Sequence, residues 1–210
     1  MRFYRLLTIA LLSGLLAACE PEGGHEVIPE NPTPENPTPE EPTPEEPEEP
    51  VFPENPLSTL DGDVEVVFSS DNSLSYADCF GNYYKTDSYM WGLYFQNYTS
   101  KEQIYVEIMH PEHLYEMPLG TYTASDDIYE TGVLIKGGFD VDGYQAYSWY
   151  TRLATDAQSS ATAPVFDGSI TVEQTGEELY KVTFDLMDDR GNKITGTYEG
   201  RMMLEDFRIN

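Results

Sequence analysis

The residue whose neighbours most clearly specify a reaction is Cys19. It follows Leu16-Ala17-Ala18 at the end of an apolar run that begins at Leu6, and Arg2 and Arg5 precede that run. A positive start, a short apolar segment and small residues before a cleavage point are typical of a secretory signal peptide. Leu-Ala-Ala-Cys also matches a lipobox, where the signal is removed and the cysteine is acylated. The sequence therefore predicts a lipid on Cys19; an ordinary signal peptide with a chance cysteine is the alternative.

Residue types that bind metals occur in two short segments. In His110-Pro111-Glu112-His113, the proline and the strand before it predict a loop, and the spacing implies no further ligand. Asp140-Val141-Asp142-Gly143 resembles part of a calcium loop, but Trp149 then stands where the bidentate glutamate of an EF-hand is needed. We predict no metal site; His110, His113, Asp140 and Asp142 are the weak candidates, and Ca²⁺ in an acidic turn is the alternative.

Four aromatic residues crowd one predicted strand, namely Tyr144, Tyr147, Trp149 and Tyr150. Alternation along a strand places Tyr147 and Trp149 on one face and Tyr144 and Tyr150 on the other. Since a one-sided sheet buries one face, one pair is predicted to be exposed as a stacking surface for a sugar or a contact for a protein. A second layer or a loop covering the other pair is the alternative. Candidates to extend the surface are Tyr83, Tyr84 and Tyr94.

Patterns typical of catalysis are scarce. The sequence contains no G-x-S-x-G, H-E-x-x-H or glycine-rich phosphate loop. Cys79 is the only cysteine besides Cys19, so it has no partner for an internal disulfide once Cys19 carries lipid. Its neighbours Asp78 and Phe80 disfavour a thiolate, and we expect a buried, unreactive thiol. We predict no catalytic residue.

The charge of the chain narrows the range of partners. It has 38 acidic against 11 basic side chains, a net charge of −27. Nucleic acid is excluded as a partner because its phosphates would be repelled. Direct binding of the head to an anionic membrane surface is disfavoured for the same reason. An acidic surface suits solubility, cations or basic partners.

Composition divides the chain into three parts. Residues 1–18 are the predicted signal peptide, and residues 19–56 are the lipidated cysteine with a Pro/Glu-rich stalk. Asn31-Pro32-Thr33-Pro34-Glu35 is repeated at once from Asn36 and then degenerates. Prolines and repelling glutamates favour a disordered, extended spacer, with a linker of no particular length as the alternative. Residues 57–210 form the β-rich globular domain, or head.

Apolar and polar residues alternate throughout the head, and helical periodicity is almost absent. The clearest strands are predicted around residues 64–68, 89–95 and 104–109, followed by a three-stranded meander over 170–173, 180–187 and 194–200 with turns at 176–177 and 188–192. We therefore predict an all-β, single antiparallel domain of about eight to ten strands. A calycin-like barrel is favoured slightly over a β-sandwich.

Several segments of the C-terminal half carry a family resemblance, namely Gly120-Thr121-Tyr122-Thr123, Gly168-Ser169-Ile170-Thr171-Val172, Tyr180-Lys181-Val182-Thr183-Phe184-Asp185-Leu186 and Asp189-Arg190-Gly191-Asn192-Lys193-Ile194-Thr195-Gly196-Thr197-Tyr198-Glu199-Gly200. With the lipobox and acidic stalk, they resemble surface lipoproteins of Bacteroidota, many of which have no assigned activity. The resemblance implies an outer-membrane, lipid-anchored protein whose head faces the cell exterior; the periplasmic face is the alternative.

Three functions follow as hypotheses. The first is a non-enzymatic binding or adhesion module for glycan or protein, with Tyr144, Tyr147, Trp149 and Tyr150 as its ligand-binding residues. The second is an accessory subunit of an outer-membrane complex. The third is an enzyme, most plausibly a hydrolase, which needs two convergent carboxylates in a cleft.

Overall fold

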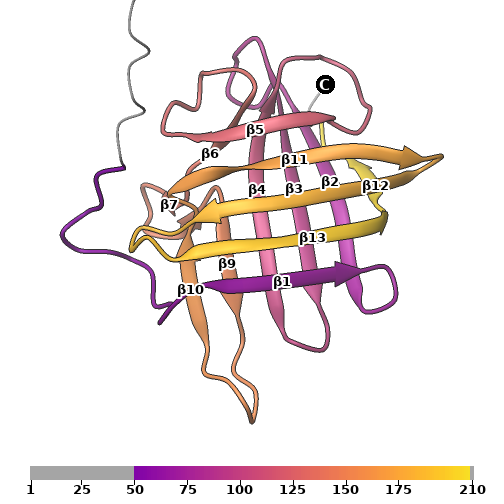
Figure 1. The fold of residues 1–210 in the computed structure, drawn as a ribbon. Coiled ribbons are helices and arrows are strands. Elements are labelled where there is room, and N and C mark those ends of the chain that lie inside the picture. Colours follow the sequence, from indigo (N-terminus) through magenta and orange to yellow (C-terminus); the bar gives the residue numbers. More distant parts are fainter. Residues whose placement is uncertain (1–49, 209–210) are drawn as a thin grey trace, which may run out of the picture. The chain divides into compact units, whose positions relative to one another are not determined.

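The computed structural model describes residues 50–208, all of which belong to one compact unit. The expected signal peptide, the lipidation of Cys19 and most of the stalk lie outside the described residues. Within residues 50–208 the chain forms fourteen strands (Figure 1). In this range no helix is long and apolar enough to cross a membrane.

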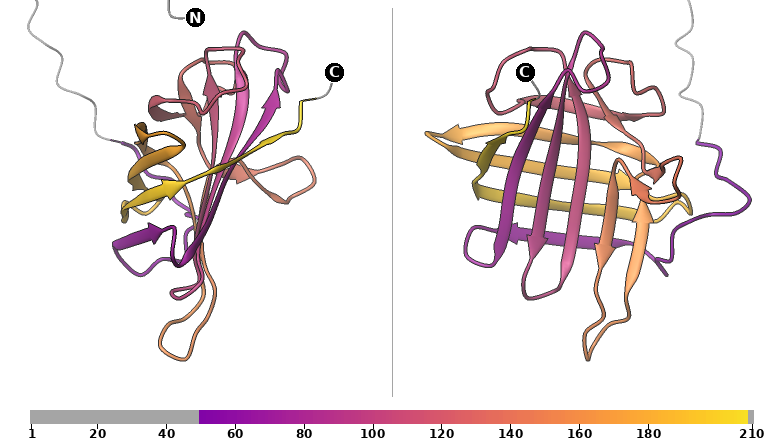
Figure 2. Two further views of the ribbon diagram at one scale, coloured as in Figure 1. Left: turned by 90° about the vertical axis from the view of Figure 1, so that its right-hand side faces the viewer. Right: turned by 180° about the vertical axis from the view of Figure 1, so that it is seen from behind.

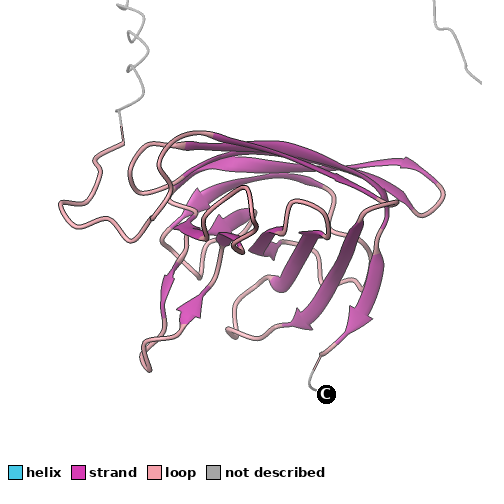
Figure 3. Ribbon diagram, turned by 90° about the horizontal axis from the view of Figure 1, so that it is seen from below, coloured by secondary structure: helices cyan, strands magenta, loops and turns pink. Residues whose placement is uncertain are grey.

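Twelve of these strands form one mixed sheet that curls over into two layers. Ten follow one path, in the order β1-β13-β12-β11-β5-β6-β4-β3-β2-β14, and the other two, β9 and β10, branch from it at β4. The front layer in Figure 1 is made of β1 (Val64–Ser69), β5 (Gly120–Ser125), β11 (Asp167–Gly176), β12 (Leu179–Met187) and β13 (Lys193–Arg201). Its strands run across those of the rear layer, so the two layers pack in a crossed arrangement (Figures 1 and 3).

The rear layer carries the features that matter below. It is made of β2 (Ser73–Gly81), β3 (Tyr89–Asn97), β4 (Glu102–His110), β6 (Val133–Ile135), β9 (Trp149–Arg152), β10 (Ala161–Pro164) and β14 (Met203–Asp206). β9 pairs with both β4 and β10. A separate small hairpin, β7 (Gly138–Phe139) and β8 (Gln145–Ala146), follows β6 and projects from this layer (Figure 2).

The all-β class is confirmed, and the curled sheet forms a half-barrel. The predicted meander is present as β11, β12 and β13, which pair antiparallel in register. Two features differ from the prediction: several strands have only two to four residues, so the count exceeds ten, and the sheet is mixed. β1 pairs with β13, β14 with β2, and β5 with β6 in parallel. The first two pairs join strands far apart in the chain, and β5 is followed by the loop 126–132 rather than by a tight hairpin turn.

The core lies between the two layers and is filled by alternate residues of each strand. Trp91, Phe95 and Phe184 are buried there, with the rings of Phe95 and Phe184 5.0 Å apart in an edge-to-face contact. In the rear layer Ala77 of β2 lies opposite Leu93 of β3, and Leu93 lies opposite Val106 of β4; all three are completely buried. The residues that precede and follow each of these along its strand therefore point to the outer face of the rear layer.

Buried hydrogen bonds attach the segment before β1 to the head. The turn between β12 and β13 holds Asp188, which is completely buried and accepts hydrogen bonds from Ser58 Oγ at 2.5 Å and from the Asn192 backbone N–H at 2.8 Å. The neighbouring Asp189 accepts the backbone N–H groups of Leu57 and Ser58. Both carboxylates are thus satisfied by fixed donors, which makes this turn the attachment point of the incoming segment.

Candidate functional site

One register line across the outer face of the rear layer is aromatic on four neighbouring strands. Tyr76 of β2 lies opposite Tyr94 of β3, Tyr94 opposite Tyr105 of β4, and Tyr105 opposite Trp149 of β9. We call these four residues the aromatic row. The rings of Tyr76 and Tyr94 stack with centroids 4.8 Å apart, as expected for adjacent strands. The row places three phenol rings and one indole side by side on a face that no other layer of the described residues covers.

Polar residues flank the aromatic row on both sides. The next register line on the same face lies two residues from the aromatic row along each strand. In it Glu205 of β14 lies opposite Asp78, Asp78 opposite Gly92, and Gly92 opposite Glu107 of β4. We call Glu205, Asp78 and Glu107 the carboxyl row. On the other side of the aromatic row, Gln96, Gln103 and Thr151 share a register line that we call the amide row. Aromatic rings are thus bordered by acceptors on one side and by amides and a hydroxyl on the other.

Gly92 determines where the Tyr105 side chain lies. A Cβ added at Gly92 would be 2.7 Å from Tyr105 Oη, so the missing side chain leaves the space that the phenol occupies. From there Tyr105 Oη donates to Glu107 Oε1 at 3.1 Å, and Tyr84 Oη donates to Glu107 Oε2 at 3.3 Å. Glu107 is only 8% exposed, and its backbone N–H is bonded to Ser148 Oγ. Both oxygens of a nearly buried carboxyl group are therefore held in place.

The electrostatics of the carboxyl row follow from burial. Burial raises the pKa of Glu107, and the hydrogen bonds from Tyr105 and Tyr84 oppose that rise. Burial and the charge of Glu205 raise the pKa of Asp78 to about 6. Asp78 Oδ1 is buried without a hydrogen-bond partner in the described part of the chain. The face therefore holds one carboxyl group with both oxygens bonded and one with an unused acceptor.

Three adjoining pockets run along this face and form what we call the outer groove. The first, about 200 Å³, is lined by Tyr94, Tyr105, Trp149 and the amide-row residue Gln103, among others. The second, about 390 Å³, shares Tyr105, Glu107 and Tyr147 with the first. The third, about 490 Å³, shares Phe80 and Tyr83 with the second. Pockets of this size, mostly aromatic with a few fixed polar groups, suit small polar ligands or short chain segments.

The β7–β8 hairpin supplies one wall of the outer groove, and Trp149 holds that wall. Trp149 Nε1 donates to Ala146 O at 2.8 Å and to Gly138 O at 3.2 Å, one contact to each strand of the hairpin. The ring is 6% exposed and lines the first pocket. Trp149 thus positions the hairpin and presents part of its ring to the groove.

The four aromatic residues predicted on one strand are divided between two. β8 ends at Ala146 and β9 begins at Trp149, because Tyr147 has a left-handed backbone with φ of 70° that interrupts the strand. Tyr147 and Trp149 line the outer groove, whereas Tyr150 is completely buried in the core and bonds Glu102. Tyr144 is 71% exposed near the hairpin turn. The structure therefore brings Tyr147 and Trp149 together and separates Tyr144 and Tyr150 from them.

The weak metal candidates have structural roles. His110 Nδ1 is 2.6 Å from Tyr122 Oη, and the His113 ring stacks on Tyr89 at 4.7 Å. Burial lowers the pKa of His110. Asp140 Oδ1 accepts the backbone N–H groups of Asp142 and Tyr144 in the hairpin turn. Within residues 50–208 no group of three or more His, Cys, Asp or Glu side chains is arranged to hold a metal ion.

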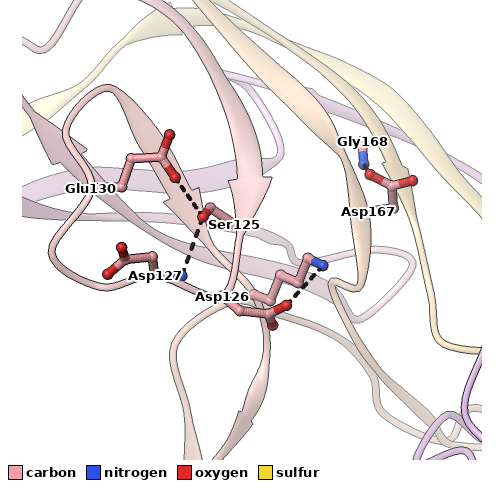
Figure 4. Close-up of polar contacts among 7 residues, drawn as sticks. Ser125, Asp126, Asp127, Glu130, Asp167 and Gly168 are labelled. Carbon is pink, nitrogen blue, oxygen red and sulfur yellow. Dashed lines mark hydrogen bonds and ion pairs between the residues drawn. The ribbon is translucent and has the colours of Figure 1, made fainter. Parts of the chain in front are cut away.

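Other acidic turns also use their carboxylates locally. In the loop after β5, Ser125 Oγ donates to Glu130 at 2.7 Å, and Lys136 pairs with Asp126 at 3.2 Å (Figure 4). Asp167 accepts the N–H of Gly168 in the same view. Cys79 points into the core, completely buried, and burial raises the pKa of its thiol. A nucleophilic role for Cys79 therefore has no structural support.

No family model matches the chain, and no curated protein or solved structure matches it either. The site must therefore be interpreted from its own chemistry. Sequence patterns singled out Tyr147, Trp149 and the neighbouring Tyr83, Tyr84 and Tyr94, all of which line the outer groove. They missed Tyr76, Tyr105, Asp78 and Glu107. The only available signal was alternation, which gives the face of each residue but not its partner on the next strand.

Proposed function

We propose that the head is a non-enzymatic binding module whose outer groove takes glycan chains, held on the outer membrane by lipid at Cys19 and facing the cell exterior. The observation that carries this proposal is the aromatic row between the carboxyl and amide rows. Tyr76, Tyr94, Tyr105 and Trp149 lie in one register line on an uncovered sheet face. A solvent-facing sheet needs no such residues for folding.

The chemistry of the groove suits a sugar. Sugar rings combine apolar C–H faces, which pack on aromatic rings, with hydroxyl groups that need donors and acceptors. Tyrosines supply the rings, and Gln103 and Thr151 supply polar partners beside them in the first pocket. Burial raises the pKa of Tyr84 and Tyr105, so both remain neutral phenols in the physiological range. Because each donates its proton to Glu107, the hydroxyl oxygens are left as acceptors for a sugar.

Anchor and stalk complete the proposed arrangement. More than one acyl chain on Cys19 gives stable membrane attachment, since a single chain binds only marginally. A proline-rich stalk extends by about 3.1 Å per residue, so its thirty-odd residues could hold the head on the order of 100 Å from the membrane. Such a spacer favours a ligand outside the envelope over one at the membrane surface.

The test is a glycan array probed with full-length protein in detergent, with and without Ca²⁺. We expect selective binding that Tyr94→Ala weakens about 30-fold, as for an aromatic residue central to an interface. The matched control is Tyr129→Ala, since Tyr129 is 68% exposed and lines none of the three pockets of the outer groove. Absence of binding to every glycan, or equal losses in the two variants, would contradict the proposal.

A second candidate function, an accessory subunit of an outer-membrane complex, is favoured by the tip of the β7–β8 hairpin. Val141 is fully exposed there, and Phe139 and Tyr144 are exposed as well. Three apolar or aromatic side chains on one projecting hairpin suit a protein contact. Crosslinking from Val141→Cys in intact cells would test it: a specific protein adduct supports this function, and no adduct argues against it.

A further inference from the structure

The third pocket of the outer groove differs in charge from the other two. It is lined by Phe80, Asn82, Tyr83, Tyr89, Lys85 and Arg208 and contains two cationic side chains. The first two pockets contain no lysine or arginine, and both include Glu107. Because Phe80 and Tyr83 line the second and third pockets together, the groove is continuous and has an acidic part and a basic end.

The two cations belong to a chain that has few. Only 11 of 210 residues are lysine or arginine, against 38 aspartates and glutamates. Arg208 is ion-paired with Asp206, so the charge of Lys85 is the one that departs locally from the negative field of the protein. Charges more than about 8 Å apart are largely screened at physiological ionic strength, so the nearest side chains determine the preference of the pocket.

The guanidinium of Arg208 is held firmly at the pocket. Its Nε and an Nη donate to the two carboxylate oxygens of Asp206 at 2.8 and 2.6 Å, and the group lies 5.0 Å from the centre of the Tyr115 ring. Gly81 allows the close approach, since a Cβ there would be 2.9 Å from Arg208 Cγ. Asp206 uses two of the five guanidinium N–H donors, and a hydrogen bond to Tyr89 also raises the pKa of Arg208; the remaining donors can reach a ligand.

Lys85 approaches the same pocket from the loop between β2 and β3. Its backbone has a φ of 59°, and Asn82 fixes the loop by accepting the N–H groups of Lys85 and Thr86. The side chain is exposed, and no ion pair to it occurs in the described part of the chain. Lys85 therefore supplies a charge that an incoming anion can reach at little desolvation cost.

We infer that this basic end binds the anionic substituent, a carboxylate or a sulfate, of an acidic saccharide whose neutral rings occupy the rest of the outer groove. The inference rests on the proposed glycan-binding function and specifies its ligand class. Glu107, which lines the first two pockets, disfavours a second anionic group farther along the groove, and the net charge of −27 repels a polyanion. The favoured ligand therefore carries isolated anionic groups rather than one on every ring.

The test compares three groups of array glycans, namely neutral, carboxylated and sulfated, using full-length protein in detergent. We expect the tightest binding to glycans with one anionic sugar, and Lys85→Gln to weaken that binding about tenfold, the value of one charge-assisted contact. Lys101→Gln is the matched control, because Lys101 is also exposed, also has a left-handed backbone with φ of 62°, and lines none of the three pockets.

Methyl esterification of the carboxylated glycan that binds most tightly gives a second test, in which the ligand is changed instead of the protein. Wild-type protein should bind the methyl ester about as weakly as Lys85→Gln binds the free acid. Binding of the ester to Lys85→Gln should be little weaker still, because both changes remove the same interaction. Binding of neutral glycans as tight as acidic ones, unchanged in Lys85→Gln, would overturn the inference and leave the proposed function intact. Absence of binding to any glycan would overturn both. A preference among the carboxylated or sulfated glycans identifies the anion.

Discussion

The two outer faces of the curled sheet differ sharply although both meet solvent. On the front layer, Thr121, Thr171, Thr183 and Thr197 share one register line, and acidic and basic residues flank it. On the rear layer the corresponding line is the aromatic row. The front face has the threonine and charge content usual for a half-buried antiparallel sheet. The same chain thus provides its own reference for what folding alone requires.

That difference separates structural from functional demands. Inner faces of both layers are apolar because they form one core, and neither needs a special outer face to do so. A buried carboxyl group held by two tyrosines costs stability that a threonine face avoids. This contrast supports our proposal that the rear face serves a ligand.

The largest expected effect concerns Asp188, a buried carboxylate on the front side whose hydrogen bonds are satisfied. Asp188→Ala removes the acceptor for Ser58 and for the backbone of the β12–β13 turn. Several buried donors lose their partner, so the free energy of unfolding should fall by about 3 kcal/mol. Urea denaturation of the full-length protein measures it. A change below about 1 kcal/mol would show that the hydrogen bonds to Asp188 contribute little to stability.

Substitution of a glycine should have different effects in the two layers. At Gly196 of β13 an added Cβ would lie 1.9 Å from the carbonyl oxygen of Val66, so Gly196→Ala must move the β1 backbone and should cost about 3 kcal/mol. At Gly92 the Cβ meets only the end of the Tyr105 side chain. Gly92→Ala should cost about 1 kcal/mol yet impair ligand binding. Equal stability losses, with binding retained in Gly92→Ala, would contradict this distinction.

Hydroxyl groups provide the third contrast. The hydrogen bond from Tyr105 lowers the pKa of Glu107. Tyr105→Phe removes that bond, so the pKa of Glu107 should rise further. The variant should lose about 1 kcal/mol near pH 7 and little near pH 4, where Glu107 is protonated in both folded and unfolded chains. Thr183→Val removes an outward hydroxyl of the front face and should change stability by less than about 0.5 kcal/mol at either pH.

Substitution of Asp78 is expected to have an effect of similar size to that of Tyr105→Phe but of opposite sign. Its pKa is raised to about 6 from 3.8, so its contribution to stability is fully present below pH 4 and is lost as the pH rises through 6. Asp78→Asn removes that loss and should stabilise the protein by about 1 kcal/mol above pH 7, allowing for its partial exposure, with no change near pH 4. Thermal denaturation at both pH values checks this. Destabilisation at pH 7 would show that the carboxylate is satisfied.

Alternation and turn chemistry predict much of this fold but not the site. Val182, Phe184 and Leu186 alternate with polar residues between two good turns, so the meander follows from local pattern. Pairing of β14 with β2 joins residues more than a hundred positions apart, and no local signal encodes it. In the aromatic row, Tyr105 and Trp149 come from strands more than forty positions apart. Tyr76, Tyr94 and Tyr105 come from consecutive strands whose loops do not specify the register, so each could be assigned to a face but not to its partner. The break at Tyr147 was likewise invisible, because tyrosine rarely adopts a positive φ.

The most direct test of the central claim is hydrogen exchange of the full-length protein with and without the glycan that the array selects. The account predicts slower exchange in β3, β4 and the β7–β8 hairpin, which line the outer groove, and unchanged exchange in β11, β12 and β13 of the front layer. Protection confined to the front layer, or no protection anywhere at saturating glycan, would contradict it.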